Sequence, residues 1–216
     1  MRAKFITFEG GDGSGKSTQA RRLAEHLGQS GREVVLTREP GGSPLAERLR
    51  QLILDPATPR HSPLAEALMF SAARADHLDA TIRPALARGA WVISDRFADS
   101  TRVYQGLAGG LASETVDILE RLVVGDTAPD LTLLLDIDPV VGLARVDRRR
   151  AGSDGADAAS DGFEARETEF HQRLRAGFLA LARAAPQRIV VLDATLPPFD
   201  LSDKIRAIVA QRFGAS

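Results

Sequence analysis

The chain has 216 residues, of which 44% are hydrophobic and 26% charged, and its formal net charge is −1. This length and composition fit one globular domain, and the near-neutral charge gives no basic field of the kind that attracts nucleic acid. Cysteine is absent, which excludes disulfides and cysteine-based metal sites, and no apolar run approaches the ~20 residues that cross a bilayer. The first predicted strand begins at Phe5 and leaves no room for a signal peptide, so we expect a cytoplasmic protein that binds neither nucleic acid nor membranes.

The N-terminal region predicts a strand, a phosphate-binding loop and a helix in direct succession. An apolar run at residues 5–9 precedes a glycine-rich loop with the spacing G-x-x-x-x-G-K-S. Glycines let the backbone approach an anion closely, so that successive N–H groups converge on a phosphate. The lysine then places a charge on the β- and γ-phosphates, and the hydroxyl after it is a Mg²⁺ ligand. The residues predicted to bind the triphosphate are Gly10, Gly11, Asp12, Gly13, Ser14, Gly15, Lys16, Ser17 and Thr18.

A flexible glycine–serine turn that happens to contain a lysine is the alternative interpretation of this loop. The helical spacing of Ala20, Leu23, Ala24 and Leu27, with Gly28 where a C-cap is expected, argues against it. With strand, loop and helix in register, the pattern predicts a nucleoside triphosphate site, although it does not say what the triphosphate is for.

Further along the chain, four more apolar runs predict strands, at residues 33–37, 90–94, 131–137 and 188–192. Helical patterns separate these runs. One of them, from Leu78 to Gly89, contains Pro84, which predicts a kink or a boundary there. Five strands that alternate with helices predict a three-layer α/β fold with a parallel five-stranded sheet, as in P-loop NTPases, with residues 1–216 forming a single domain.

Charged residues collect where the predicted strands end. Asp95 closes a buried strand, where a carboxylate is costly unless something pairs with it. It would either orient Mg²⁺ or its waters, or pair with Arg96 for structural reasons. Arg38, Arg74 and Arg96 lie on or before loops that would face one cleft, which favours an anionic acceptor, although each alone is typical of a solvated surface. Phe70 is by residue type a core side chain, and it would stack on a base only at the mouth of a cleft.

A run of three arginines, Arg148, Arg149 and Arg150, precedes a small, polar, glycine-rich segment at residues 151–162. This composition predicts a mobile lid at approximately residues 148–163. A lid arginine would close over the phosphates and neutralise the charge of the transferring group. The alternative is a solvated helix end, where cations meet the C-terminal dipole favourably. The residues alone do not decide between the two.

Several motifs, taken together and in order, resemble those of the bacterial thymidylate kinase family. The resemblance runs from residue 5 to about residue 185. Many families share the glycine loop, so the specific part is the Arg-Glu-Pro-Gly-Gly turn at 38–42 and the Asp-Arg, Ser-Thr and Tyr-Gln-Gly groups between 95 and 106. The other matching groups are Leu68-Met69-Phe70, Ala72-Ala73-Arg74 and Pro129-Asp130-Leu131-Thr132.

This resemblance implies phosphoryl transfer from MgATP to dTMP, giving dTDP and ADP, by a homodimer packed through helices beside the sheet. It implies that Phe70 stacks on thymine, which reverses the preference from the residues alone. Arg74 and Thr101 would lie at the base, and Tyr104 would crowd the sugar 2′ position. The implied dTMP-binding residues are Asp12, Glu39, Pro40, Phe70, Arg74, Arg96, Ser100, Thr101, Tyr104 and Gln105. The implied catalytic residues are Lys16, Arg96, Arg149 and Asp12. The implied Mg²⁺ ligands, directly or through water, are Ser17 and Asp95.

Two positions qualify the resemblance. Gly13 stands where some members have an arginine in the phosphate loop, which favours a catalytic arginine from the lid, Arg149. Gly162 stands where the lid usually ends in an arginine, and Arg148, Arg149, Arg150 or Arg166 would have to compensate. Another small nucleotide or nucleoside kinase with a phosphate loop, or a non-catalytic nucleotide-binding module, are the competing interpretations.

Overall fold

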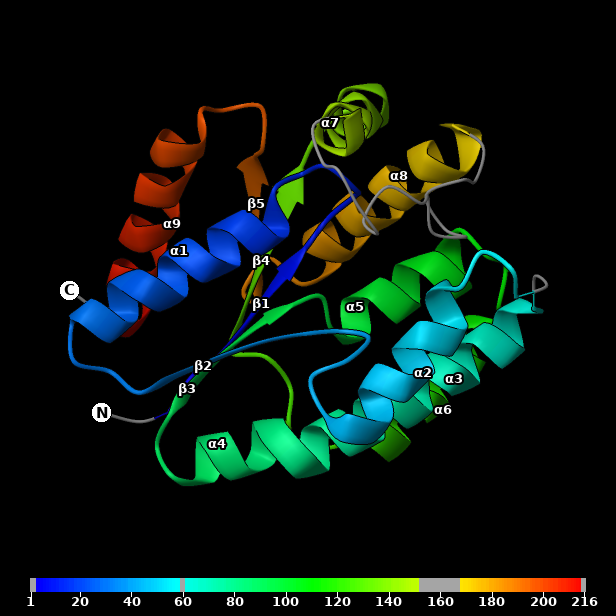
Figure 1. Cartoon of the computed structure of the whole chain (residues 1–216), viewed down its shortest axis with the longest axis horizontal. Helices are drawn as coiled ribbons and strands as arrows, with labels where there is room; N and C mark the ends of the chain where they lie inside the picture. Colours follow the sequence, from blue (N-terminus) through cyan, green and yellow to red (C-terminus); the bar gives the residue numbers. More distant parts are fainter. Residues whose placement is uncertain (1–2, 59–60, 152–167, 215–216) are drawn as a thin grey trace.

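The computed structural model describes residues 3–58, 61–151 and 168–214 of the chain. Strands and helices alternate along it (Figure 1). The strands are β1 (Phe5–Glu9), β2 (Val34–Arg38), β3 (Trp91–Asp95), β4 (Leu131–Asp136) and β5 (Ile189–Asp193). The helices are α1 (Lys16–Gln29), α2 (Pro44–Leu54), α3 (Pro63–His77), α4 (Arg83–Ala87), α5 (Ala98–Thr101), α6 (Ser113–Val123), α7 (Pro139–Ala151), α8 (Thr168–Ala184) and α9 (Pro198–Phe213), with two π-helical segments, η1 (Leu78–Ile82) and η2 (Arg102–Leu107).

All five strands pair in parallel, in the order β2-β3-β1-β4-β5. The predicted five-stranded parallel sheet is confirmed, and each predicted strand boundary falls within one residue of the observed one. Because β3 and β4 flank β1, the loops that leave these strands meet at one carboxyl edge, where open α/β sheets bind ligands.

Backbone hydrogen bonds connect the end of β3 and the residue after it with both neighbouring strands. The N–H of Arg96 donates to the carbonyl of Phe8 at 2.9 Å, and the N–H of Glu39 donates to the carbonyl of Asp95 at 2.9 Å. The chain leaving β3 is therefore bonded to β1 on one side and to the exit of β2 on the other. These backbone hydrogen bonds bring together side chains that lie far apart in the sequence.

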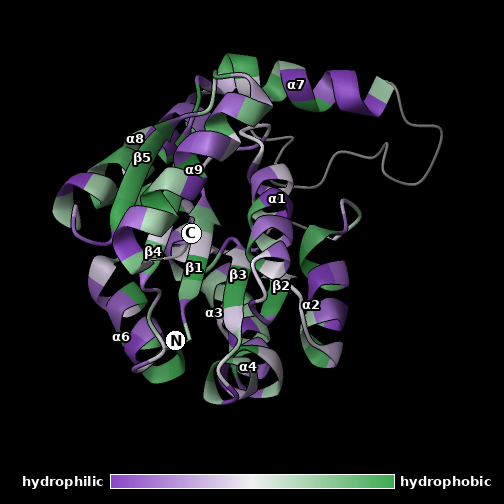
Figure 2. Cartoon of the chain, turned by 90° about the vertical axis from the view of Figure 1, so that its left-hand side faces the viewer, coloured by the Kyte–Doolittle hydropathy of each residue, from purple (hydrophilic) through white to green (hydrophobic). Residues whose placement is uncertain are grey.

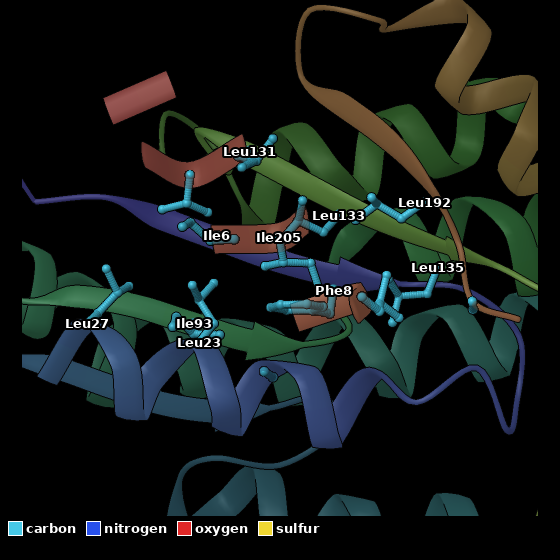
Figure 3. Close-up of a cluster of buried hydrophobic side chains, with 14 of the residues drawn as sticks. Ile6, Phe8, Leu23, Leu27, Ile93, Leu131, Leu133, Leu135, Leu192 and Ile205 are labelled. Atoms are coloured by element: carbon cyan, nitrogen blue, oxygen red, sulfur yellow. The ribbon is translucent and has the colours of Figure 1, made fainter. Parts of the chain in front are cut away.

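The alternation of side chains along each strand explains the three layers. Leu133 and Leu135 of β4 join the cluster that packs against α1 and α9, whereas Leu134 joins a cluster formed with α8. Figure 1 shows α1 and α9 side by side over one face of the sheet, and Figure 3 shows how their side chains meet those of the strands. Burying one leucine-sized side chain contributes about 1.5–3 kcal/mol, so this layer fixes α1 and the loop that precedes it. The labelled members are Ile6, Phe8, Leu23, Leu27, Ile93, Leu131, Leu133, Leu135, Leu192 and Ile205.

The helical region before β3 changes its winding twice. α3 ends at His77, η1 covers Leu78–Ile82, and α4 begins at Arg83 with Pro84 in its first turn. The predicted kink or boundary at Pro84 is confirmed, because the winding changes beside it: the N–H of Arg83 donates to the carbonyl of Leu78, five residues earlier, and α4 begins there.

Figure 2 shows α7 at the end of the molecule opposite the N-terminus, drawn in purple (hydrophilic) and green (hydrophobic) bands. The predicted lid at 148–163 overlaps α7 as far as Ala151, and the rest of it, including Gly162, lies outside the described residues, as does Arg166. Within the described ranges, no helix combines the length and the apolar character needed to cross a membrane.

Candidate active site

A cavity of about 920 Å³ lies at the carboxyl edge of the sheet, where the loops after β1, β2 and β3 meet α3, η2 and α7. Arg38, Arg74 and Arg96, expected to face one cleft, all line it. The site residues predicted from the sequence that line it are Asp12, Gly13, Gly15, Lys16, Ser17, Thr18, Glu39, Pro40, Phe70, Arg74, Asp95, Arg96, Ser100, Thr101, Tyr104, Gln105 and Arg149. The glycine-rich loop and the family resemblance thus pointed to residues that line one cavity.

Three predicted residues, Gly10, Gly11 and Ser14, are not among those that line the cavity. Each instead accepts a hydrogen bond from a cationic side chain of the site. The Gly10 carbonyl bonds to Arg96 Nη1 at 3.2 Å, and the Gly11 carbonyl bonds to Lys16 Nζ at 2.7 Å. Ser14 Oγ lies 3.4 Å from the same Lys16 Nζ. These residues hold the two cations in place from behind.

The glycine-rich loop requires glycine where it is most tightly packed. Gly10 and Gly13 have φ values of 136° and 71°, which residues with a Cβ rarely adopt. A Cβ on Gly10 would lie 2.4 Å from the carbonyl oxygen of Leu135, and one on Gly13 would lie 2.0 Å from that of Gly142. The loop is thus wedged between the end of β4 and the start of α7. Its glycines serve this close packing as well as the backbone conformation.

Lys16 begins α1, and its ammonium group is largely buried. Burial, followed by the nearby charge of Arg96, lowers the pKa of Lys16 to about 8, and Asp12 and Asp95 only partly offset this. A phosphate group close to this lysine would favour its charged form. Lys16 is thus a cation that an anionic ligand stabilises.

Asp95 and Ser17 form a pair beside Lys16 that fits a divalent cation. The Ser17 hydroxyl donates to Asp95 Oδ2, and Asp95 Oδ1 is buried with no hydrogen-bond partner among the described residues. A buried carboxylate oxygen without a partner is costly, and a hydroxyl next to it supplies a second hard oxygen ligand. No group of three acidic, histidine or cysteine side chains suited to a metal occurs within the described residues. A site of this composition suits Mg²⁺, which usually takes one or two protein oxygens together with substrate phosphates.

Arg96 connects the phosphate loop with the opposite wall of the cavity. Its Nη2 donates to Asp12 Oδ1 at 2.6 Å, its Nη1 lies 3.3 Å from Ser100 Oγ, and its guanidinium lies 5.2 Å from the ring centroid of Tyr104. The Arg96 side chain bonds to Asp12 and the Asp95 carboxylate to Ser17, so the two neighbours interact through their charges and not through a hydrogen bond among the described residues. Burial favours a raised pKa for Asp12, but the charges of Arg96 and Lys16 outweigh it and hold that pKa below its usual range.

The far wall of the cavity carries the residues expected at a base and a sugar. Arg74 is buried and donates to Glu39 Oε2 at 2.7 Å and to Thr101 Oγ1 at 3.1 Å. Phe70 lines the cavity and also packs against the cluster around α8, so it is neither a pure core residue nor a surface one. A cavity with cations at one end and an aromatic side chain beside an arginine at the other can hold a nucleotide.

Tyr104 and Gln105 lie on η2 and are both largely buried. Gln105 Nε2 donates to Glu66 Oε2 at 3.0 Å, which fixes the amide from behind. Pro40 follows a cis peptide bond, and its carbonyl accepts from Arg50 Nη1 at 2.7 Å. These protein–protein contacts hold the lining residues in place before any ligand binds.

Of the three consecutive arginines, Arg149 alone is among the residues that line the cavity. Arg145 lines it too, one helical turn earlier on α7, and bonds to the carbonyl of Ala194 at 2.8 Å. Sequence reasoning missed Arg145, although the i, i+4 spacing from Arg149 places both on one helix face.

Sequence reasoning also gave no role to Glu9, which ends β1. It accepts hydrogen bonds from the N–H of Phe97 at 2.8 Å and from Ser100 Oγ at 2.6 Å, so it ties the segment after β3 to β1. Burial, reinforced by the nearby Asp99, raises the pKa of Glu9 to about 8. The sequence feature that could have indicated a role for Glu9 is its position, because Glu9 ends a buried strand as Asp95 does.

Comparison with known proteins agrees with this geometry. A family model described as thymidylate kinase matches residues 8–205. The chain is 50% identical to the thymidylate kinase of Caulobacter vibrioides over 97% of both chains, and 51% identical to that of Dinoroseobacter shibae over 94% of this chain and 95% of the other. A crystal structure of thymidylate kinase from Ehrlichia chaffeensis superimposes with a TM-score of 0.76 at 34% identity, covering 97% of this chain and 99% of the other. The chain therefore belongs to the thymidylate kinase family.

Proposed function

We propose that this chain transfers the γ-phosphoryl group of ATP to dTMP and releases dTDP and ADP. The observation that carries the proposal is the position of Arg96, which bonds to Gly10 and Asp12 on the phosphate loop and reaches Ser100 on the opposite wall of one cavity. A cation shared in this way favours the meeting of two phosphate groups, one held by the loop and one by the far wall.

The proposed reaction is an in-line attack by a phosphate oxygen of dTMP on the γ-phosphorus of ATP, with ADP as the leaving group. The acceptor oxygen is already anionic, so it needs little help from a general base. Catalysis then consists of positioning and of neutralising the charge of the transferring group. We assign the neutralisation to Lys16, Arg96 and Arg149, which line the same cavity.

Mg²⁺ is part of the proposal. Ser17 and Asp95 would hold it, Asp95 directly or through water, because their oxygens are paired and one is buried without a partner within the described structure. When bound, the ion neutralises part of the charge on the nucleotide phosphates.

In the acceptor pocket, we assign thymine to Phe70, Arg74 and Thr101, and the sugar 2′ position to Tyr104. Arg96 and Asp12 would meet the phosphate and the 3′-hydroxyl region. Glu39, Pro40, Ser100 and Gln105 complete the pocket, and all of them line the cavity.

A lid at approximately residues 148–163, carrying Arg149 on a single domain of residues 1–216, also belongs to the proposal. The support from the described residues is that α7 leads from the phosphate loop, which Gly142 contacts, to Arg149 at the cavity. We place the enzyme in the cytoplasm.

We further propose a homodimer. α3 and α6 are in contact and expose large apolar side chains, namely Leu64 and Leu68 on α3 and Ile118 and Leu122 on α6. Leu122 is 79% exposed. A symmetric interface would bury this surface. Sedimentation would test it: Leu122→Glu should shift the protein toward monomer, whereas the control Phe199→Glu, at the 72% exposed residue on α9, should not.

A coupled assay of ADP release in the presence of MgATP tests the main proposal. dTMP should support turnover, and a panel of dUMP, dCMP, AMP and thymidine should support much less. Preference for another acceptor would indicate a different small nucleotide or nucleoside kinase. Tight nucleotide binding without transfer to any acceptor would indicate a non-catalytic module.

A further inference from the structure

We propose that His77 is a positioning residue for base recognition. It fixes Glu39, and through Glu39 it fixes the guanidinium group of Arg74. Because the proposed function places Arg74 at thymine, this inference rests on that function. His77 ends α3 and is not among the residues that line the cavity, so it would act only through its neighbours.

A continuous chain of hydrogen bonds links the ring to the pocket. Thr37 Oγ1 lies 2.7 Å from His77 Nε2, and His77 Nδ1 lies 3.1 Å from Glu39 Oε1. Glu39 Oε2 accepts from Arg74 Nε at 2.7 Å. Arg74 Nη2 then donates to Thr101 Oγ1 at 3.1 Å. Each oxygen of the Glu39 carboxylate thus has its own partner, one from His77 and one from Arg74.

The Glu39 carboxylate determines which nitrogen of the His77 ring carries a hydrogen. Ionised Glu39 can only accept, so His77 Nδ1 carries the hydrogen and donates. The Thr37 hydroxyl suits either state of Nε2, since it can donate to a bare nitrogen or accept from an N–H. His77 is therefore held from both sides of its ring, in one orientation.

This chain of contacts leaves one donor of Arg74 for a ligand. Nε and Nη2 are used by Glu39, by Thr101 and by the carbonyl of Phe97, the last at 3.2 Å. Nη1 has no partner among the described residues, and Arg74 lines the cavity. A base carbonyl is the acceptor that this remaining N–H suits, and its direction depends on the bonds that hold the other two nitrogens.

Burial makes the arrangement sensitive to loss of a partner. The exposed fractions of His77, Glu39 and Arg74 are 0%, 6% and 4%. Water therefore cannot easily replace a lost hydrogen bond, and a freed carboxylate oxygen would draw the Arg74 guanidinium toward itself.

The turn after β2 packs against the contact between His77 and Thr37. A Cβ on Gly42 would lie 2.4 Å from His77 Nε2 and 2.3 Å from Thr37 Oγ1, and Gly42 has a φ of 84°. A glycine at this position leaves the His77–Thr37 contact intact. The glycine-rich turn thus protects the histidine, in addition to shaping the backbone.

A buried histidine whose role is only to fill the core is the competing explanation. Three substitutions separate the two. His77→Asn keeps an N–H donor near the position of Nδ1, facing Glu39. His77→Gln instead places its amide near Nε2, facing Thr37. His77→Leu fills similar volume and bonds to neither.

The test measures steady-state kinetics for dTMP, for ATP and for 5-methyl-dCMP, in which an amino group replaces the ring carbonyl at position 4 and the adjacent N3 carries no hydrogen. We expect His77→Leu to lower kcat/KM for dTMP about tenfold, as for loss of one buried hydrogen bond, and to leave KM for ATP nearly unchanged. The preference for dTMP over 5-methyl-dCMP should fall by a similar factor. His77→Asn should recover most of both losses and His77→Gln should not.

A role in folding alone would lower thermal stability in all three variants without changing the preference between the two bases. Equal kinetics for His77→Asn and His77→Leu would overturn the proposal, and so would equal losses for dTMP and ATP. In a double-mutant cycle, His77→Leu should cost little in an Arg74→Gln background, because both act at one contact. Additive losses would also overturn it.

The proposed function has separate points of failure. It fails if the unmodified enzyme does not phosphorylate dTMP, or if Arg74→Gln leaves KM for dTMP unchanged. The inference about His77 fails on its own if both of these results are as expected and the His77 variants behave alike.

Discussion

Arg96 donates to Asp12 at 2.6 Å from a backbone conformation that arginine rarely adopts, with a φ of 72°. It is the only residue other than glycine with positive φ within the described residues. The left-handed conformation costs a residue with a Cβ about 1–2 kcal/mol. Backbone bonds impose it, because the Arg96 N–H donates to Phe8 and its carbonyl accepts from Ser94 Oγ at 2.8 Å. Strain is thus stored at the residue whose guanidinium we propose as the cation shared by the two phosphate groups.

Two substitutions that both remove the side chain should separate strain from function. Arg96→Gly and Arg96→Ala should each lower turnover by a factor of about 100 or more, because neither neutralises the transferring phosphoryl group. Arg96→Gly should be more stable than Arg96→Ala by about 1 kcal/mol, because only alanine retains the left-handed penalty. Urea unfolding measures the difference. Equal midpoints, or a more stable alanine variant, would show that the backbone at this residue is not strained.

The lowered pKa of Lys16 leads us to expect proton uptake when ATP binds. Its pKa is lowered to about 8, so at pH about 8.5 part of the population is neutral before binding. Phosphate groups beside the ammonium favour the charged form, which raises the pKa and takes up protons. Binding should therefore weaken as pH rises through about 8.

Calorimetry in two buffers with different ionisation enthalpies would measure this uptake directly. Lys16→Ala is the control, and it should bind ATP without taking up protons and show no turnover, while dTMP binding survives. Proton uptake that persists in Lys16→Ala would assign the effect to another group.

The strands and the phosphate loop could be predicted because the information for them is local. An apolar run followed by G-x-x-x-x-G-K-S fixes a strand, a turn and a helix start within a few residues of sequence. The resemblance to a known family then located the far wall of the cavity, where single residues such as Phe70 were ambiguous.

The partners of the charged side chains could not be predicted in the same way. Asp95 and Arg96 are neighbours in sequence, yet their side chains bond to Ser17 and Asp12, which β1 and its loop bring beside them. The proposed role of His77, which ends α3, likewise depends on its contact with Glu39, which directly follows β2. Such pairings follow from strand order and register, which composition and spacing leave open.

Two glycines of the same loop offer a matched test of its packing. Gly13→Ala would place a methyl group 2.0 Å from the carbonyl oxygen of Gly142 and force a positive φ on alanine. Gly11→Ala would meet nothing within 4 Å. We expect Gly13→Ala to lower the free energy of unfolding by about 2 kcal/mol or more, and Gly11→Ala to change it by less than about 1 kcal/mol. Similar losses in both variants would contradict the contact between the loop and α7.

Glu9 should make stability depend on pH. Its folded-state pKa, about 8, lies above the ordinary value of 4.5, so the folded protein binds this proton more tightly than the unfolded chain. The stabilisation is fully present below pH about 4.5 and is lost as pH rises through about 8. Between these limits the unmodified protein should lose up to about 1.4 kcal/mol per pH unit relative to Glu9→Gln.

Denaturant unfolding from pH about 5 to about 8 compares the two proteins. The amide of Glu9→Gln can still accept from the Phe97 N–H and donate to Ser100 Oγ, so folding should be retained. Glu25→Gln, at an exposed residue of α1, is the control and should follow the unmodified protein at every pH. A constant difference between Glu9→Gln and the unmodified protein would mean that Glu9 does not bind the proton.

Arg149 and Arg148 are adjacent, yet only Arg149 lines the cavity. Arg149→Ala should lower kcat at least about tenfold, because an arginine aimed at the transferring phosphoryl group stabilises the transition state more than the bound substrate. KM for ATP should rise less than about threefold. Arg148→Ala, which removes the same charge from the same helix end, should leave both constants within about twofold, because a distant, solvated charge contributes little. Steady-state assays with saturating dTMP measure all four values. Unchanged kcat in Arg149→Ala would move the role to another arginine, and equal losses in the two variants would show that the charge of the helix end matters and the position of Arg149 does not.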